Sequence, residues 1–220
     1  MAYTLALIII SVAAISSTVR IAIQKAMRTM AGKQAKTLTA DHIDDLLFFA
    51  ERSRHLDRNR VIVLLSIKAG LRAGEIANLT WSMVLDAAGG IGNIIELRDD
   101  AAKKGSGRSI PIHPDLRDAL ERLDAKSRVN DYVVRSERGG RINPNSIVNW
   151  FAVAYATLGL QNCSSHSGRR TFITRAARLV HKAGGSLRDV QLLAGHRSIQ
   201  TTQRYIDGDS DVQRRLISLI

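Results

Sequence analysis

The chain has 220 residues, which is enough to bury a substantial core in one domain, or in one domain with an appendage. It carries 32 Lys and Arg against 20 Asp and Glu, and the resulting net charge of +12 favours a polyanionic partner: nucleic acid first, an anionic membrane surface second. Apolar residues make up 45% of the chain and recur in periodic segments, which excludes a disordered basic tail. A single cysteine, Cys163, excludes an intramolecular disulfide and a cysteine-based zinc site, so the expected location is the cytoplasm.

Residues 1–36 are predicted to be an N-terminal segment separate from the main domain. Residues 1–19 contain no charge, and basic residues follow from Arg20 onward. Two interpretations stay open: a membrane span, since about 20 apolar residues suffice, or a buried helix of a truncated N-terminal domain. No basic residue precedes the apolar stretch, so it makes a poor secretory signal.

The main domain is predicted to begin near Thr37, after a short polar and basic linker. Thr39 can cap a helix whose apolar positions Ile43, Leu46, Leu47 and Ala50 recur at helical spacing. A second helix is expected over 58–69, ended by Gly70, and a third from Ala73.

A β-hairpin is predicted next, with strands over 93–97 and 109–112 and a polar, basic loop over 98–108. Further helices are expected over 114–125, 145–158, 169–183 and 187–193, separated by glycine-containing breaks. The apolar residues of the C-terminal tail, 209–220, suit either docking on a neighbouring protomer or packing on their own domain.

Four segments contain side chains suited to phosphate chemistry. Residues 69–79 place Arg72 at a helix start with Glu75 one helical turn later, and the basic loop holds Lys103 eight residues before Pro111. His166 precedes Arg169 by three residues, a spacing that points both side chains the same way on a helix. The segment 193–205 contains Gly195-His196 and then Tyr205, nine residues after the histidine.

Each segment has an ordinary explanation when taken alone. Arg72 and Glu75 are spaced like a surface ion pair, Lys103 like a solvated loop lysine, and Tyr205 like an amphipathic tyrosine on a C-terminal helix. In this order, however, the four segments make residues 37–208 resemble the catalytic domain of the tyrosine recombinase, or phage integrase, family. The resemblance implies a mainly helical α+β fold with a small antiparallel β-sheet or hairpin.

The resemblance also implies roles for individual side chains. Tyr205 would be the nucleophile that forms a 3′-phosphotyrosine link to DNA, with Arg72 and Arg169 binding the phosphate oxygens. His166 would accept or relay the tyrosine proton, His196 would donate a further hydrogen bond, and Lys103 would protonate the departing 5′ oxygen. Glu75 would orient the Arg72 guanidinium without contacting the phosphate itself.

The expected function is therefore site-specific DNA recombination or integration by strand cleavage and transesterification. No cofactor and no metal is expected, because the phosphodiester energy is kept in the covalent link and no P-loop is present. Double-stranded DNA and a homo-oligomer on it are the expected partners; a full-length recombinase or accessory protein, and a membrane contact, stay open. Two alternatives also stay open: a DNA-binding regulator without recombination activity, and a type IB topoisomerase-like strand relaxer.

Overall fold

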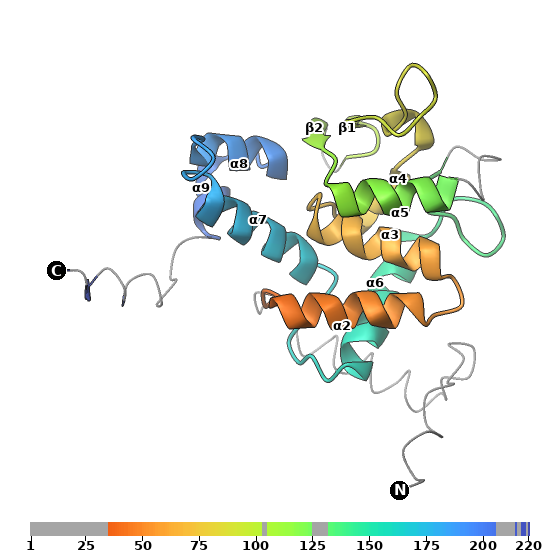
Figure 1. The fold of residues 1–220 in the computed structure, drawn as a ribbon, viewed down its shortest axis with the longest axis horizontal. Coiled ribbons are helices and arrows are strands. Elements are labelled where there is room, and N and C mark those ends of the chain that lie inside the picture. Colours follow the sequence, from red (N-terminus) through yellow and green to blue (C-terminus); the bar gives the residue numbers. More distant parts are fainter. Residues whose placement is uncertain (1–34, 103–104, 125–131, 206–213, 215–216, 219) are drawn as a thin grey trace, which may run out of the picture.

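The structure is a computed structural model that describes residues 35–102, 105–124, 132–205, 214, 217–218 and 220. It is mainly helical with one small antiparallel sheet (Figure 1), which confirms the predicted α+β class. No helix within the described ranges has the length and apolarity needed to cross a membrane. Nearly all of segment 1–36, including its uncharged stretch, and most of tail 209–220 lie outside the described residues.

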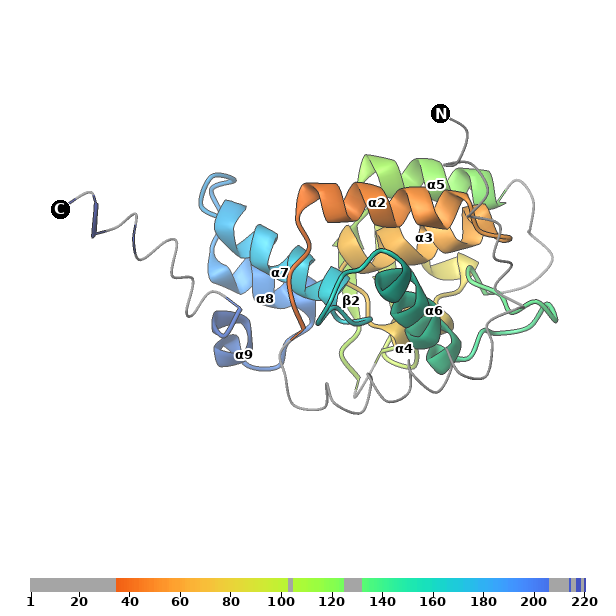
Figure 2. The ribbon, with the colours of Figure 1, turned by 90° about the horizontal axis from the view of Figure 1, so that it is seen from below.

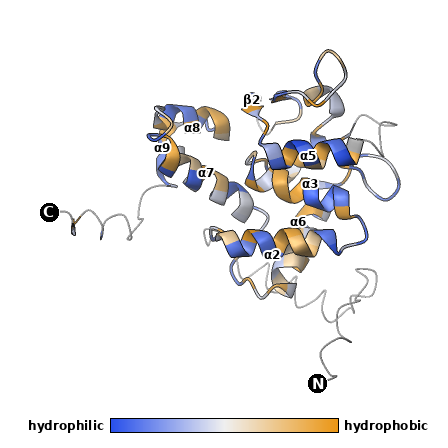
Figure 3. Ribbon diagram, in the orientation of Figure 1, coloured by the Kyte–Doolittle hydropathy of each residue, from blue (hydrophilic) through white to orange (hydrophobic). Residues whose placement is uncertain are grey.

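Helix α3 (Leu56–Ile67) is the centre of the main core. Seven consecutive residues, 61–67, are buried, so this part of the helix is enclosed on all sides. The helix packs against α2 (Ala40–Glu51), α5 (Pro114–Asp124) and α7 (Ser167–Leu179). The Thr39 hydroxyl accepts a bond from the backbone N–H of His42 at the start of α2, as a helix cap does. Figure 3 shows hydrophilic residues on the outward surface of α5 and apolar segments along α3.

Helices α4 (Ala73–Asn78) and α6 (Pro144–Thr157) pack together below the layer formed by α2, α3 and α5 (Figure 2). Asn143 caps α6 by accepting from the N–H of Asn145, and Pro144 suits the first helical position because it has no N–H to satisfy. A short 3-10 helix, η2 (Trp81–Met83), leads from α4 toward the hairpin.

The hairpin consists of β1 (Ile94–Leu97) and β2 (Arg108–Pro111), paired antiparallel with Leu97 opposite Arg108. Alternation buries Ile95, Leu97 and Ile110 against the main core. The hairpin was predicted at this place in the chain, with strand bounds that differ by at most one residue. The end of β2 next to the connecting loop, where Arg108 lies, is close to α8 (Leu187–Ala194).

The C-terminal helices α7, α8 and α9 (Ile199–Gln203) enclose a second, smaller core. It contains Ile173, Ala177, Val190 and Ala194, with Tyr205 packed against it. Helix α7 joins the two cores because its first turn lies against α3: a Cβ added at Gly168 would lie 3.0 Å from the Cβ of Ser66. The two cores therefore meet at the N-terminal end of α7.

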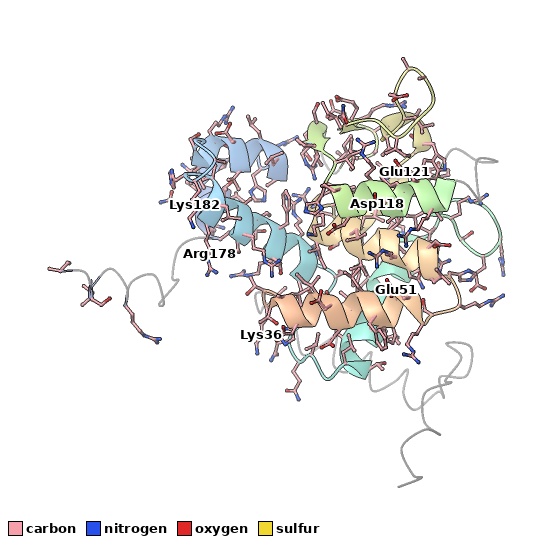
Figure 4. All side chains as sticks on the ribbon, viewed as in Figure 1. Lys36, Glu51, Asp118, Glu121, Arg178 and Lys182 are labelled. Carbon is pink, nitrogen blue, oxygen red and sulfur yellow. The ribbon has the colours of Figure 1, made fainter. Side chains whose placement is uncertain are left out.

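Charged side chains project outward from the described helices and from the segments beside them. Figure 4 labels examples on the outer surface, all of them exposed: Lys36, Glu51, Asp118, Glu121, Arg178 and Lys182.

Several predicted helix bounds were wrong by a few residues, and one helix was missed. The second helix runs over 56–67 rather than 58–69, and α7 ends at Leu179 rather than at residue 183, because the chain forms turns before Gly184-Gly185. The five-residue helix α9 was not predicted; a single turn is too short to show helical periodicity.

Candidate active site

Arg72 and Glu75 pair at the start of α4. Gly70 has a left-handed backbone (φ +64°), and after this turn Arg72 becomes the N-cap residue. The backbone N–H of Arg72 donates to Glu75 Oε2 at 3.0 Å, and its Nη1 donates to Oε1 at 2.5 Å. The Glu75 side chain is 1% exposed and that of Arg72 is 24% exposed. The predicted pair is therefore not a surface ion pair: a buried carboxylate orients a guanidinium that still reaches solvent.

Arg169 lies in the first turn of α7, where the two cores meet, and is buried. Its Nη1 donates to the carbonyl of Gly70 at 2.5 Å and its Nη2 to that of Ala194 at 2.6 Å. One guanidinium thus joins the turn before α4 to the end of α8. Burial, with the nearby charges of Arg72 and Arg108, lowers the pKa of Arg169 to about 10, so this side chain remains a cation at neutral pH.

Arg108, the first residue of β2, belongs to the same cluster and was missed in the sequence. Its Nε donates to the carbonyl of Leu193 at 2.8 Å, and its Nη2 and Nη1 donate to the two oxygens of Glu75 at 3.0 and 3.3 Å. A usable signal was present: alternation in a strand puts Arg108 on the same face as Ile110, which is buried, so an inward arginine was predictable once the strand was.

His196 follows Gly195, whose left-handed backbone (φ +61°) ends α8 and turns the histidine inward, as predicted. The Nδ1 atom of His196 lies 3.0 Å from the hydroxyl oxygen of Thr202 on α9, and the His196 carbonyl accepts from Gln191 Nε2. Burial, reinforced by the positive charge of neighbouring arginines, lowers the pKa of His196 to about 4. The imidazole is therefore neutral at pH 7, with one nitrogen able to donate and the other able to accept.

Tyr205 lies two residues after α9 and stacks on His196. The ring centroids are 5.4 Å apart and the ring planes differ by 22°. The guanidinium carbon of Arg170 lies 5.7 Å from the centre of the tyrosine ring on its face. Packing against the small C-terminal core thus holds the phenol next to His196.

The other two predicted site residues are His166 and Lys103. His166 is the exposed N-cap residue of α7, and its right-handed helical backbone (φ −88°, ψ −11°) leaves it one turn before Arg169. Lys103 lies outside the described residues.

The charge of the assembled cluster is positive. Arg72, Arg108 and Arg169 surround one carboxylate, Glu75. Burial acts to raise the pKa of Glu75, but hydrogen bonds and charges from Arg108 and Arg72 outweigh it and lower that pKa, so Glu75 is an anion at neutral pH. Three cations and one anion leave an unbalanced positive charge that suits a bound anion with several acceptor oxygens. In the described part of the chain, no three His, Cys, Asp or Glu side chains come close enough together to hold a metal ion.

Comparison with known proteins places the chain in a family. The sequence profile of the Phage integrase family matches residues 36–211. The chain belongs to the phage integrase family. This membership confirms the resemblance that the four sequence segments indicated.

Individual relatives agree with the family. The chain is 31% identical over 163 residues to tyrosine recombinase XerC of Corynebacterium efficiens, covering 71% of this chain and 48% of the relative. It is 31% identical over 174 residues to tyrosine recombinase XerA of Thermococcus kodakarensis, covering 77% and 57%. The chain therefore spans about half the length of these relatives.

Solved structures show the same fold. A crystal structure of XerA recombinase superimposes with a TM-score of 0.66 at 26% identity, covering 85% of this chain and 65% of that one. A lambda integrase dimer bound to a core DNA site superimposes with a TM-score of 0.63 at 19% identity, covering 86% and 58%.

Proposed function

We propose that the arginine cluster, His196 and Tyr205 form the active site of a tyrosine recombinase that cleaves and rejoins DNA for site-specific recombination or integration. The observation that carries the proposal is the stacking of Tyr205 on His196 beside three guanidiniums. Membership of the phage integrase family supports it, as do relatives that are tyrosine recombinases. In this proposal residues 37–208 are the catalytic unit, and 1–36 and 209–220 flank it.

The cluster suits attack by a phenol on a phosphodiester. A bond forms between the Tyr205 oxygen and phosphorus while the bond from phosphorus to the 5′ oxygen breaks. The result is a 3′-phosphotyrosine and a 5′ hydroxyl. Arg72, which reaches solvent, binds a non-bridging oxygen, and the neighbouring charge of Arg169 stabilises the negative charge that develops at phosphorus.

Proton transfer is assigned to the histidines and Lys103. His166 accepts or relays the phenol proton, neutral His196 donates a hydrogen bond to the phosphate from its second nitrogen, and Lys103 protonates the 5′ oxygen. The roles of His166 and Lys103 are carried over from the family resemblance. Reversal of the same step, with a hydroxyl from another strand, rejoins the DNA without loss of phosphodiester energy.

The proposed partners are double-stranded DNA and further copies of the chain on it. The net charge of +12 favours DNA, and solved neighbours include a lambda integrase dimer bound to a core site. A DNA substrate fits the cytoplasmic location expected from the composition. A full-length recombinase or an accessory protein is a further proposed partner.

Covalent trapping on a suicide substrate tests the proposal. The wild-type chain should form a protein–DNA adduct on a nicked duplex that carries its site, and Tyr205→Phe should form none while binding the same DNA with unchanged salt dependence. Tyr155→Phe is the matched control, because the Tyr155 hydroxyl is buried in the main core without a hydrogen-bond partner among the described residues. It should form the adduct at the wild-type rate. An adduct of undiminished yield with Tyr205→Phe would refute the assignment.

A further inference from the structure

Arg108 differs from Arg72 in how much of its side chain reaches solvent. Its side chain is 5% exposed, and its Nε, Nη1 and Nη2 atoms all donate to protein acceptors: the Leu193 and Ser106 carbonyls and both oxygens of Glu75. Arg72 has 24% of its side chain accessible. An anion that enters from solvent therefore meets Arg72, whereas the hydrogen bonds of Arg108 point into the protein.

Glu75 needs this second arginine because its carboxylate is buried. An ionised carboxylate removed from water is costly unless it is paired and hydrogen-bonded. Arg108 contacts both oxygens of Glu75, while the Arg72 guanidinium contacts Oε1. Arg108 thus supplies a two-point counter-charge, and Arg72 does not have to neutralise Glu75 alone.

The Nε atom of Arg108 reaches the turn that precedes His196. Its Nε donates to Leu193, in the last turn of α8, and its guanidinium lies against the backbone of Gly195: a Cβ built there would be 2.9 Å from Nη1. A single side chain from β2 therefore fixes the start of α4, which carries Arg72, relative to the end of α8, which presents His196.

We infer that Arg108 is a positioning residue of the active site: it neutralises Glu75 so that Arg72 remains directed at the substrate phosphate, and it holds the His196 turn in place. The inference rests on the proposed function for its effect on DNA cleavage. Without Arg108, the Arg72 guanidinium, which already donates to Glu75 Oε1, would have to satisfy both carboxylate oxygens, and the phosphate would lose that donor. Removal of the Glu75 charge should then release Arg72 again.

A double-mutant cycle on the full chain tests this coupling. Under single-turnover conditions on the suicide substrate, Arg108→Met should slow adduct formation about a hundredfold, as loss of a charged donor to the transition state does. Glu75→Gln alone should slow it about tenfold, and the double variant should cleave at least about tenfold faster than Arg108→Met. DNA affinity should change little in all three, because one donor to one phosphate is a small part of the electrostatic contact with a duplex.

A purely structural role gives a different pattern. If Arg108 acted through stability alone, the two losses would multiply, and a double variant no faster than Arg108→Met overturns the inference. Arg117→Met is the matched control: Arg117 on α5 donates to the carbonyls of Ile91 and Gly92 at the other end of the hairpin. It should lower the thermal midpoint without slowing adduct formation by folded protein.

Arg108→Lys covers the case in which the methionine variant does not fold. Lysine keeps the charge but cannot span both Glu75 oxygens while donating to Leu193. Its cleavage rate should fall below wild type and should recover when Glu75→Gln is added. A wild-type rate for Arg108→Lys shows that the fork is not needed and overturns the inference.

Inorganic phosphate separates this inference from the proposed function. Phosphate should raise the thermal midpoint of the wild-type chain, should fail to do so for Arg108→Met, and should regain part of the effect in the double variant. A wild-type chain that shows this pattern but forms no adduct refutes the proposed function and supports the role of Arg108. The same phosphate response in wild type and Arg108→Met refutes the role of Arg108.

Discussion

Acidification should destabilise this protein through His196. Burial and the charges of Arg169, Arg72 and Arg108 lower the pKa of His196 to about 4 in the folded chain. In the unfolded chain the imidazole returns to its ordinary pKa of about 6.5. Between these values the unfolded state binds a proton that the folded state does not.

The sign follows from proton linkage. Because the pKa is depressed by folding, the contribution of neutral His196 to the free energy of unfolding is fully present above about pH 6.5. It is lost progressively as pH falls toward the folded value of about 4. A shift of this size corresponds to at most about 3 kcal/mol, and solvent screening of the arginine charges reduces the expected loss to about 2 kcal/mol.

Urea unfolding from pH 7.5 to 4.5 measures this contribution when wild type is compared with His196→Gln. The free energy of unfolding of wild type should fall relative to the variant by about 2 kcal/mol across the range. His181→Gln, at an exposed histidine beyond α7, should follow wild type and serves as the control. Parallel curves for wild type and His196→Gln would mean that the imidazole does not enter the folded site neutral, and the reasoning would fail.

Two further predictions concern the fold that supports the site. Gly168→Ala should lower the free energy of unfolding by about 1–3 kcal/mol, because the new methyl group would lie 3.0 Å from Ser66 Cβ and 3.1 Å from Ile67 Cγ1 between α7 and α3. Urea unfolding measures this loss. An unchanged midpoint would show that α7 and α3 accommodate the methyl group without a loss of stability. Thr39→Ala should cost about 1 kcal/mol by removing the hydroxyl that accepts from His42 N–H. Thr39→Ser should restore most of that loss, and equal destabilisation by both would exclude the cap as the cause.

Local sequence patterns predicted the features whose structural cause lies within a few residues. Thr39 caps α2 through a residue three positions away, and the buried residues of that helix follow its period. Gly195 ends α8 with a left-handed backbone that L side chains adopt at a cost, so the direction of the following histidine was readable from the sequence.

Hydrogen-bond partners that are distant in the sequence could not be predicted from local patterns. Arg108 bonds to Leu193, 85 positions later, and Arg169 bonds to Gly70, 99 positions earlier. Neither acceptor is a side chain; each is a backbone carbonyl, which leaves no trace in residue identity. The alternation of β2 predicts that Arg108 points inward. Which groups accept its hydrogen bonds depends on how α4 and α8 approach the hairpin.

The bonds that assemble the candidate site are also bonds between the two cores. Arg169 extends from the C-terminal core to Gly70 before α4, and Arg108 extends from the hairpin to the last turn of α8. The site therefore gathers like charges at the junction, and their mutual repulsion opposes the contacts that close it. A bound phosphate supplies the missing negative charge, so the same anion that is the expected substrate should also strengthen the contact between the cores. Substrate binding and docking of the segment that carries Tyr205 are thus expected to reinforce each other through one set of arginines.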